Sequence, residues 1–344
     1  MKPTCDVLIV GAGLAGSLLA WRLQQAGCKA IVVSDPSIAS ASRAAAGLIN
    51  PVTGQRLVLQ ENIEALLASA HALYHRLEEA FEITLLHKCG MLRVLRNDKE
   101  RSAWQKRRQD PAYQPYIATE LSSYQEHDAF MQYHTGFLDT NLLLNHLHAY
   151  FRESEQLIES AVDYNDIIID AAGVRLHDLQ AERIIFCEGW RGQHNPWFSH
   201  LPFQPAKGEI LTMRGHAPEH IVNRGKWLLP IGNNCFKLGA TYDWKRLDEL
   251  VTDQAEEELL NALPSLVADI EEMEVTDHVA GVRPGTVDKQ PFLGMHPEQP
   301  NIGIFNGFGS KGSLLIPWHT ERFATHLLEQ EALPAEADIG RYHG

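Results

Sequence analysis

The stretch Val7-Leu8-Ile9-Val10-Gly11-Ala12-Gly13-Leu14-Ala15-Gly16 decides the fold of this chain. Its apolar run leads into a G-x-G-x-x-G turn, and the residues from Ser17 to Gly27 have the composition of a helix. A second apolar run, Ala30 to Val33, ends at Ser34 and Asp35. This order of strand, glycine turn, helix and strand predicts a βαβ unit that binds a dinucleotide.

Each glycine of the turn has a distinct expected task. Gly11 permits the tight turn, Gly13 lets backbone N–H groups approach a pyrophosphate, and Gly16 lets the helix lie against the strand. The positive N-terminal end of the helix then faces the phosphates. The alternative interpretation is a βα turn with a purely structural role.

The bulk composition is that of an ordinary globular protein. The 344 residues are 44% hydrophobic and 22% charged, and the chain is long enough for two domains or one large composite. A net charge of −14 without a visible basic stripe argues against a nucleic-acid surface. No apolar stretch is long enough to span a bilayer, so no membrane span is expected.

Cysteine and histidine usage predicts neither disulfides nor a metal. The cysteines are scattered and odd in number, at positions Cys5, Cys28, Cys89, Cys187 and Cys235. They are interpreted as buried thiols in a reducing compartment, and with no leader pattern at the start the predicted location is cytoplasmic. The 17 histidines are mostly isolated, and no Cys/His cluster has metal-ligand spacing.

Apolar periodicity predicts the remaining elements. Helices are expected at 63–79, after the N-cap candidate Asp139 in the segment Gly136–Asp139, at 253–268 with an end or bend at Pro264, and at 313–329. Strands are expected at 88–95, 183–187, 209–213, 227–230 and 236–240, with a hairpin at 167–174. Residues 96–110 are interpreted as a surface helix or loop, and a last pair of short strands precedes the final helix.

Six further motifs follow the glycine turn along the chain. They are Ser42–Pro51, Gly136–Asp139, Ile184–Trp190, Pro205–Glu209, the segment Gly281–Thr286 followed by Asp288, Pro291 and Gly294, and Asn306–Gly312 followed by Pro317. Together and in this order they resemble the FAD-dependent D-amino-acid oxidase, glycine oxidase and sarcosine oxidase superfamily over nearly the whole chain. The Arg-Pro-Gly-Thr segment and the terminal glycine-rich segment are the most specific of the motifs.

The resemblance implies an α/β fold with a discontinuous Rossmann-like FAD-binding domain and an inserted β-rich α+β substrate domain. Cofactor-type segments at the beginning, middle and end of the chain agree with it. The expected FAD-binding domain comprises 1–85, 136–192 and 278–344. The expected substrate domain comprises 86–135 and 193–277.

The resemblance also implies a set of FAD-binding residues. They are Gly11, Ala12, Gly13, Leu14, Ala15, Gly16, Ser34, Asp35, Ser42, Arg43, Ala45, Ala46, Gly47, Leu48, Val162, Glu188, Gly189, Trp190, Arg283, Gly307, Phe308, Gly309, Ser310, Lys311 and Gly312. The family usually has Glu where this chain has Ser34, so either Ser34 or the next residue, Asp35, is expected at the ribose. Arg43 and Lys311 are expected at the cofactor or, alternatively, in solvent. Non-covalent FAD is expected because covalent members of the family attach it through a cysteine near the C-terminal part, and this chain has none after Cys235.

The implied reaction is oxidation of a small amine or amino acid to an imine by hydride transfer to the flavin, with dioxygen or another electron acceptor. Arg283 resembles the arginine that pairs with the substrate carboxylate; a structural ion pair is the alternative. Trp227, Tyr242 and Asn50 are candidate pocket residues, with core packing or a turn role as alternatives. Lys207, Lys226 and Lys311 are candidates for dioxygen activation.

Three rival functions remain open at this stage. They are an FAD domain acting on a tRNA nucleoside, a flavin-bound redox or assembly protein without turnover, and an NAD dehydrogenase. The acidic charge weighs against the first rival, and the C-terminal glycine-rich motif is unexplained by the third. The oligomeric state is not predicted.

Overall fold

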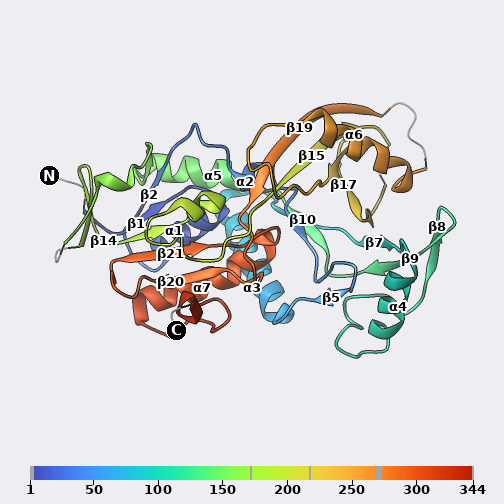
Figure 1. The fold of residues 1–344 in the computed structure, drawn as a ribbon, viewed down its shortest axis with the longest axis horizontal. Helices are drawn as coiled ribbons and strands as arrows, with labels where there is room; N and C mark the ends of the chain where they lie inside the picture. The colour runs from blue at the N-terminus through green and yellow to red at the C-terminus, as the bar shows by residue number, and fades with distance from the viewer. Residues whose placement is uncertain (1–3, 171–172, 217, 269–272, 343–344) are drawn as a thin grey trace. The chain divides into compact units, whose positions relative to one another are not determined.

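The computed structural model describes residues 4–170, 173–216, 218–268 and 273–342. Its contacts divide the chain into two compact units. Unit 1 comprises 1–43, 140–206 and 282–344, and unit 2 comprises 44–139 and 207–281. Figure 1 labels many of the helices (α) and strands (β) with the names used below, and η denotes a 3-10 helix.

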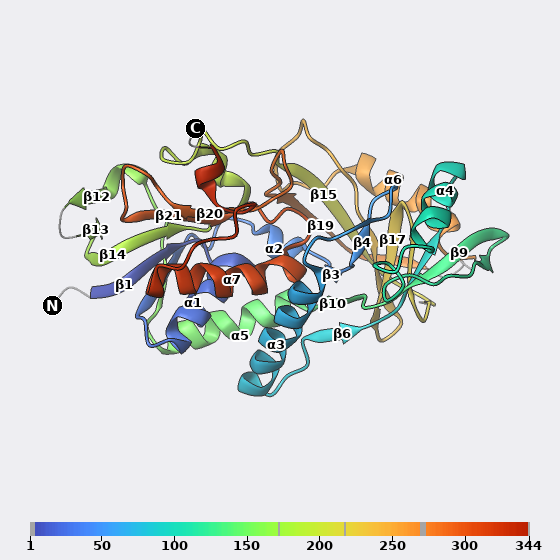
Figure 2. The ribbon, with the colours of Figure 1, turned by 90° about the horizontal axis from the view of Figure 1, so that it is seen from below.

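Unit 1 is an α/β layer structure. Its strands are β1 Thr4–Val10, β2 Ala30–Ser34, β11 Leu157–Glu159, β12 Ile167–Asp170, β13 Gly173–Leu176, β14 Leu179–Phe186, β20 Phe292–Met295 and β21 Ile302–Asn306. Its helices are α1 Leu14–Gln25, α2 Ala41–Ala44, α5 Thr140–Glu153, α7 Gly312–Glu329, η1 Tyr164–Asp166, η2 Gly189–His194 and η4 Ile339–Tyr342. Helix α1 contacts α5 and α7, and the three run side by side in Figure 2.

Five strands of unit 1 form a parallel sheet in the order β11-β2-β1-β14-β21. The register places Val10 beside both Val33 and Phe186, so the carboxyl ends of the strands lie at one edge. Leu8 and Ile9 are fully buried, as expected for strands covered on both faces. Strands β20, β13 and β12 extend the sheet in antiparallel pairings.

Unit 2 is dominated by an eight-stranded sheet in the order β19-β15-β18-β17-β16-β7-β9-β8. Its strands are β3 Leu48–Ile49, β4 Val52–Thr53, β5 Val58–Leu59, β6 Leu86–Lys88, β7 Met91–Val94, β8 Ser122–Tyr124, β9 His127–Gln132, β10 Gly136–Leu138, β15 Ala206–Arg214, β16 Ile221–Arg224, β17 Lys226–Gly232, β18 Cys235–Gly239 and β19 Glu274–Arg283. Its helices are α3 Ile63–Phe81, α4 Asp98–Arg107, α6 Asp253–Ala262 and η3 Leu263–Ser265. Leu211, Phe236 and Leu259 are among the residues that form its buried core.

Several sequence-based elements are confirmed and others need correction. The predicted strands 7–10 and 30–33 and the helix 63–79 are confirmed. Helix α1 begins at Leu14, not at Ser17, because Gly13 is its N-cap. Segment 88–95 is not one strand, since β6 and β7 are separated at Cys89 and Gly90.

Two boundaries reflect local backbone chemistry. The helix expected after Asp139 is confirmed as α5, which begins at Thr140, whereas the preceding residues Gly136–Leu138 form strand β10. They pair closely with β6, and a Cβ on Gly136 would lie 2.2 Å from the His87 carbonyl oxygen. Helix α6 ends at Ala262 and continues as η3, which contains Pro264, in agreement with the predicted break. In the predicted hairpin 167–174, Ala171 and Ala172 lie outside the described residues; β12 and β13 pair on either side.

The compact units differ from the expected domain boundaries. Residues 44–85 belong to unit 2, where strand β3 pairs with β10 and the Gly47 backbone packs on Leu138. Residues 193–206 belong to unit 1, because Phe198 and Leu201 are part of its core cluster. The assignment of a cofactor role to one domain and a substrate role to the other stays a prediction.

Within the described ranges, no helix has the length and apolar composition needed to cross a membrane. All five cysteines carry free thiols; Cys5, Cys28 and Cys187 are buried as predicted, whereas Cys89 and Cys235 are only partly buried.

The buried histidine of α7 makes the stability of unit 1 depend on pH. His319 is 4% exposed, and its Nδ1 lies 2.8 Å from the Leu315 carbonyl oxygen. Burial lowers the pKa of His319 from its ordinary value of 6.5 to about 4. The unfolded state therefore binds the proton first, and the free energy of unfolding is expected to decrease as the pH falls from 6.5 towards about 4.

Urea unfolding across this pH window measures the effect. The variant His319→Gln keeps a side-chain donor but cannot titrate, so its stability is expected to vary less with pH. Equal pH profiles for the wild-type protein and the variant would contradict the assignment.

Candidate cofactor site

The predicted cofactor residues of unit 1 gather where its parallel strands end. Strand β1 leads into Gly11, β2 into Asp35, β14 into Glu188, and β21 into Gly307. Val162 follows the end of β11, and the Ser160 N–H donates to the Ser34 carbonyl oxygen at 3.1 Å. Ligands of open α/β sheets bind outside this edge, so the fold brings the predicted residues together at a suitable place.

Gly11 and Gly16 are required by the protein's own packing. A Cβ on Gly11 would lie 2.5 Å from the Cys187 carbonyl oxygen, and Gly11 has a φ of +107°. A Cβ on Gly16 would lie 2.0 Å from the Gly11 carbonyl oxygen. These contacts hold the start of α1 against the loop after β14.

Gly13 is different, because the protein itself leaves room for a side chain there. A Cβ on Gly13 would meet only Ser40 Oγ and Ser42 Oγ, both at the ordinary contact distance of 3.4 Å. Its φ of −72° is open to any residue. A glycine that packing does not require is consistent with space kept for a ligand close to the backbone.

The N-terminus of α1 is suited to an anion. The N-cap Gly13 has no side chain to bond the first N–H groups, and the first turn contains no acidic residue. Ser42 Oγ accepts a hydrogen bond from the Leu14 N–H at 3.0 Å, which places the Ser40–Arg43 segment beside the helix start. The positive end of the helix and the space at Gly13 fit the pyrophosphate of a dinucleotide.

His148 on α5 links two parts of this site and was missed by the sequence analysis. Its Nε2 lies 2.8 Å from the Ala12 carbonyl oxygen, which can only accept, so Nε2 carries the proton. Nδ1 then accepts from Arg43 Nη2 at 3.4 Å. Burial lowers the pKa of His148, which favours this neutral form. A single histidine in a helix has no local sequence signal for such a role.

Arg43 is held by α5. Its Nη1 donates to Asn145 Oδ1 at 2.5 Å and to the Asn141 carbonyl oxygen at 3.3 Å, and Asn141 Nδ2 donates back to the Arg43 carbonyl oxygen. These contacts fix the segment that follows Ser42. Contact of Arg43 with a phosphate stays a prediction.

Asp35 and Ser34 both lie at the end of β2. Asp35 Oδ1 accepts from the N–H and the hydroxyl of Ser37 at 2.8 and 2.6 Å, and these hydrogen bonds lower the pKa of Asp35. This is the turn arrangement expected of an acid before a proline, whereas Ser34 is half-buried in the strand. Which of the two contacts the ribose stays a prediction.

Glu188 is held from two sides in the turn after β14. Oε1 accepts from the Tyr164 hydroxyl at 2.8 Å and Oε2 from Asn195 Nδ2 at 2.9 Å. Burial raises the pKa of Glu188 despite these hydrogen bonds. Its two neighbours, Gly189 and Trp190, begin η2, and the Trp190 ring lies under the Arg191 guanidinium.

Asn306, the first residue of the C-terminal glycine-rich motif, ties together the loops that follow β14 and β21, a role that the sequence did not predict. Its Nδ2 donates to the Gly189 carbonyl oxygen at 2.8 Å, and its Oδ1 accepts from the Gly307 N–H at 2.8 Å. The loop after β14 and the loop after β21 are thereby joined. Asn306 is 2% exposed, so the link is shielded from water.

The C-terminal glycine-rich loop lies against the Arg-Pro-Gly-Thr segment. The Gly309 N–H donates to the Pro284 carbonyl oxygen at 3.1 Å, and a Cβ on Gly307 would lie 2.8 Å from the Thr286 methyl carbon. Phe308 is buried, Ser310 is exposed, and Gly312 opens α7 with Lys311 as N-cap. Arg283 is half-buried at the end of β19.

The three candidate lysines have different surroundings. Lys207 is 1% exposed and its Nζ lies 2.7 Å from Asp248 Oδ1, whereas Lys226 Nζ lies 2.5 Å from Glu258 Oε1. These are ion pairs within unit 2. Lys311, at the start of α7, is half-buried, and burial lowers its pKa.

The predicted residues of unit 2 have local structural roles. Asn50 Oδ1 accepts from the Val52 N–H at 3.0 Å, the turn arrangement named as its alternative. Trp227 covers Gly239 on the neighbouring strand, where a Cβ would lie 2.6 Å from the indole. Tyr242 is 51% exposed, and its ring stacks on that of Trp244 with the ring centres 5.7 Å apart. A substrate contact for each of them stays a prediction.

The segment Ala45–Leu48 also lies in unit 2. Ala46 is buried, and Gly47 has a φ of +69° with no room for a Cβ against the Leu138 carbonyl oxygen. Contact of this segment with FAD stays a prediction. Over the ranges that the structure describes, no three His, Cys, Asp or Glu side chains gather as metal ligands would.

Comparison with known proteins identifies the chain's relatives. The family model DAO, described as FAD dependent oxidoreductase, matches residues 6–324. A glycine oxidase from Pseudomonas aeruginosa is 24% identical over 338 residues, covering 90% of this chain and 91% of that protein. The bifunctional protein ThiO/ThiG from Synechocystis sp. is 25% identical over 97% of this chain, and the alignment spans 53% of that longer protein. The crystal structure of iminodiacetate oxidase from Chelativorans sp. BNC1 has the same fold, with a TM-score of 0.81, 20% identity and 98% coverage of both chains.

The space at Gly13 leads to a first test of this site. Gly13→Val is expected to leave the protein folded but to weaken FAD binding by about 1–3 kcal/mol, because the side chain occupies the space beside the helix start. Flavin absorbance per chain and far-UV circular dichroism measure the two effects separately. As a contrast, Gly16→Val is expected to disturb the fold itself. A Gly13→Val protein with its full flavin content would contradict the prediction.

His148 gives a second test. His148→Leu removes the hydrogen bond to the Ala12 carbonyl oxygen, and FAD is expected to dissociate about tenfold more readily. His148→Gln keeps a donor and is expected to recover part of the affinity. Titration of the apoprotein with FAD measures both variants, and equal affinities for wild type and His148→Leu would contradict the positioning role.

Proposed function

The chain belongs to the DAO family of FAD-dependent oxidoreductases, and from this premise we propose that it oxidises a small, carboxylate-bearing amine or amino acid to an imine. Its relatives include glycine oxidases, which supports an amino-acid substrate. The observation that carries the proposal is the backbone contact between the Arg283-Pro284-Gly285 segment and the C-terminal glycine-rich loop. Gly309 N–H donates to the Pro284 carbonyl oxygen, and a Cβ on Gly309 would lie 3.9 Å from the Gly285 Cα.

Different segments of unit 1 would contact the two parts of FAD. The backbone at Gly13 and the start of α1 would hold the pyrophosphate, and the loop from Gly307 to Gly312 would hold the flavin end of FAD. FAD, when bound, supplies the hydride acceptor. The start of α7 and the Lys311 charge would favour the negative charge that develops on reduction.

Arg283 would orient the substrate. A guanidinium matches a carboxylate with two parallel hydrogen bonds, so it fixes orientation as well as affinity. Because Arg283 is the last residue of β19 and directly precedes Pro284, whose carbonyl oxygen accepts from the Gly309 N–H, its position relative to the glycine-rich loop is constrained by backbone contacts. With the amine bound in its neutral form, no separate general base is required.

Anaerobic mixing of the purified protein with a panel of amines tests the function. We expect the oxidised flavin band to bleach with at least one of glycine, D-amino acids, N-methyl amino acids or cyclic imino acids. Protein that is folded but binds no FAD would contradict the proposal. Persistence of the band with every amine would favour the redox or assembly role over turnover. The substrate, the electron acceptor, non-covalent attachment and a cytoplasmic location stay predictions.

The role of Arg283 is tested by substitution. Arg283→Ala is expected to lower kcat/KM for amino acids by an amount that corresponds to about 2–3 kcal/mol of lost transition-state stabilisation, while flavin content and turnover of amines without a carboxylate change little. Arg283→Lys keeps the positive charge but lacks the planar guanidinium. Its kcat/KM for amino acids is expected to lie between those of the wild-type protein and Arg283→Ala. Unchanged kinetics for carboxylate substrates would remove the assigned role.

A further inference from the structure

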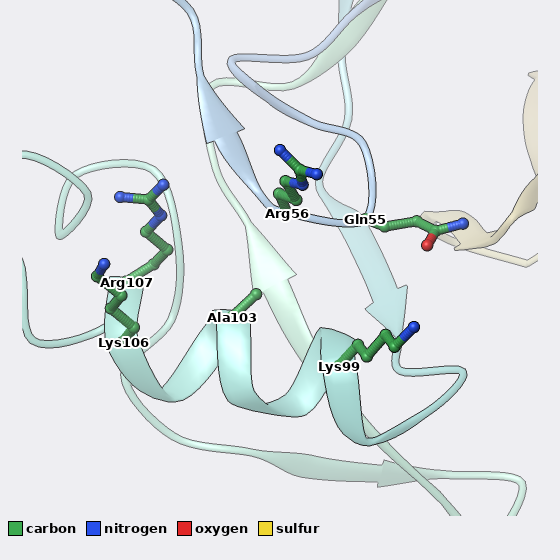
Figure 3. A pocket seen from close by; sticks show the side chains of 6 residues that line it. All are labelled: Gln55, Arg56, Lys99, Ala103, Lys106 and Arg107. Carbon is green, nitrogen blue, oxygen red and sulfur yellow. The ribbon is translucent and has the colours of Figure 1, made fainter.

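A cavity of about 430 Å³ lies in unit 2 between helix α4 and the loop that joins β4 to β5. It is lined by Gln55, Arg56, Lys99, Ala103, Lys106 and Arg107. Four of these six residues are cationic and none is acidic. Figure 3 shows Arg56 on the loop, opposite the helix that carries Lys99, Lys106 and Arg107.

The spacing of the helix residues explains the concave shape. Positions 99, 103, 106 and 107 lie on one face of α4, because they are separated by about one and two helical turns. Ala103 is the short residue in the middle of this face, so the longer cations stand around it. The adjacent face of α4 is anchored by Glu100 and Trp104, which are 0% and 4% exposed.

Buried contacts fix the loop relative to the helix. Glu100 Oε1 lies 3.1 Å from Arg93 Nη2, which also donates to the Gly54 carbonyl oxygen at 3.4 Å. Gln132 Nε2 donates to the Val52 carbonyl oxygen at 2.9 Å. The two walls of the cavity are therefore held by a buried ion pair and hydrogen bonds.

The side chain of Arg107, one of the four cations, is held in place by an aromatic ring. The Arg107 guanidinium lies 4.7 Å from the centre of the Tyr113 ring, and the Tyr113 hydroxyl accepts from the Leu59 N–H at 3.1 Å. Tyr113 thus connects the end of α4 to the strand after the loop. A cation held in place loses less side-chain entropy when it binds an anion.

The cavity has an excess of positive charge. Over the described ranges, none of the ion pairs contains Arg56, Lys99, Lys106 or Arg107, and the nearby Glu100 carboxylate is bonded to Arg93 and Arg96. Residues 93–108 contain seven basic and two acidic residues in a chain whose net charge is −14. The net charge of the chain therefore conceals a local basic cluster.

We propose that this cavity binds a compact ligand with two or more phosphate groups. Two guanidinium and two ammonium groups around a small cavity match several closely spaced negative charges. A long nucleic acid fits less well, because the basic residues lie on one short helix and one loop while the rest of the chain is acidic. The proposal does not rest on the proposed oxidation, since none of the six lining residues belongs to the predicted FAD or substrate set.

Calorimetric titration of the full-length holoprotein with inorganic triphosphate tests the proposal. We expect saturable one-to-one binding that weakens with added salt, and weaker binding of orthophosphate. Arg56→Gln and Lys106→Gln are each expected to reduce the affinity by about three- to tenfold. Lys29→Gln, which removes an exposed charge from unit 1, is the matched control and is expected to bind like wild type.

Two further measurements keep the outcomes distinct. Flavin absorbance and amine-dependent bleaching of each variant are expected to match wild type, which separates this site from the proposed function. Absence of triphosphate binding, or equal binding by Arg56→Gln, Lys106→Gln and wild type, would overturn the proposal. Tighter binding of an RNA oligonucleotide than of triphosphate, lost in the same variants, would overturn the choice of a compact ligand.

Discussion

The fold of unit 1 depends on the close approach of two backbone segments at Gly11, Gly16 and Cys187. A Cβ on either glycine would overlap a carbonyl oxygen, so the helix start can lie against the end of β14 only without those side chains. This approach fixes the direction in which α1 presents its N-terminal N–H groups. The space at Gly13 and the contact with Ser42 follow from it.

Polar links then extend this arrangement around the sheet edge. His148 connects the glycine turn to the Arg43 segment, and Asn306 connects the loop after β14 to the loop after β21. Neither residue has to contact a ligand to affect binding. Each fixes the position of backbone groups that would contact the ligand. The candidate cofactor site is in this sense assembled from carbonyl and amide groups more than from side chains.

The sequence predicted the parts of the structure that are locally encoded. Gly11 to Gly16 with apolar runs on both sides identify β1, α1 and β2, and the spacing of Ile63 to Leu77 identifies α3. The strand Gly136–Leu138 was missed because its pairing partners, β3 and β6, lie far away in the chain. Residue 44 as a unit boundary was missed for the same reason.

Side-chain partners across long sequence separations were equally hidden. His148 bonds to Ala12 across 136 residues and Asn306 to Gly189 across 117. The α4 cavity shows a different limit of prediction from sequence. Its basic residues are visible in the sequence, but the negative net charge of the whole chain conceals them. Only the packing of the β4–β5 loop on α4 makes them neighbours.

The order of strands in the parallel sheet also bears on how the protein is made. Strand β14 pairs Ile184 with Ile302, so one edge of its ladder is completed by a segment that is synthesised more than a hundred residues later. Strand β13 covers this side of β14 only at Leu179–Ala181, so until the β21 segment leaves the ribosome Ile184–Phe186 have one unpaired side, and the two glycine loops cannot be joined by Asn306. The nascent chain thus passes through a long interval in which an apolar strand edge needs protection from other chains.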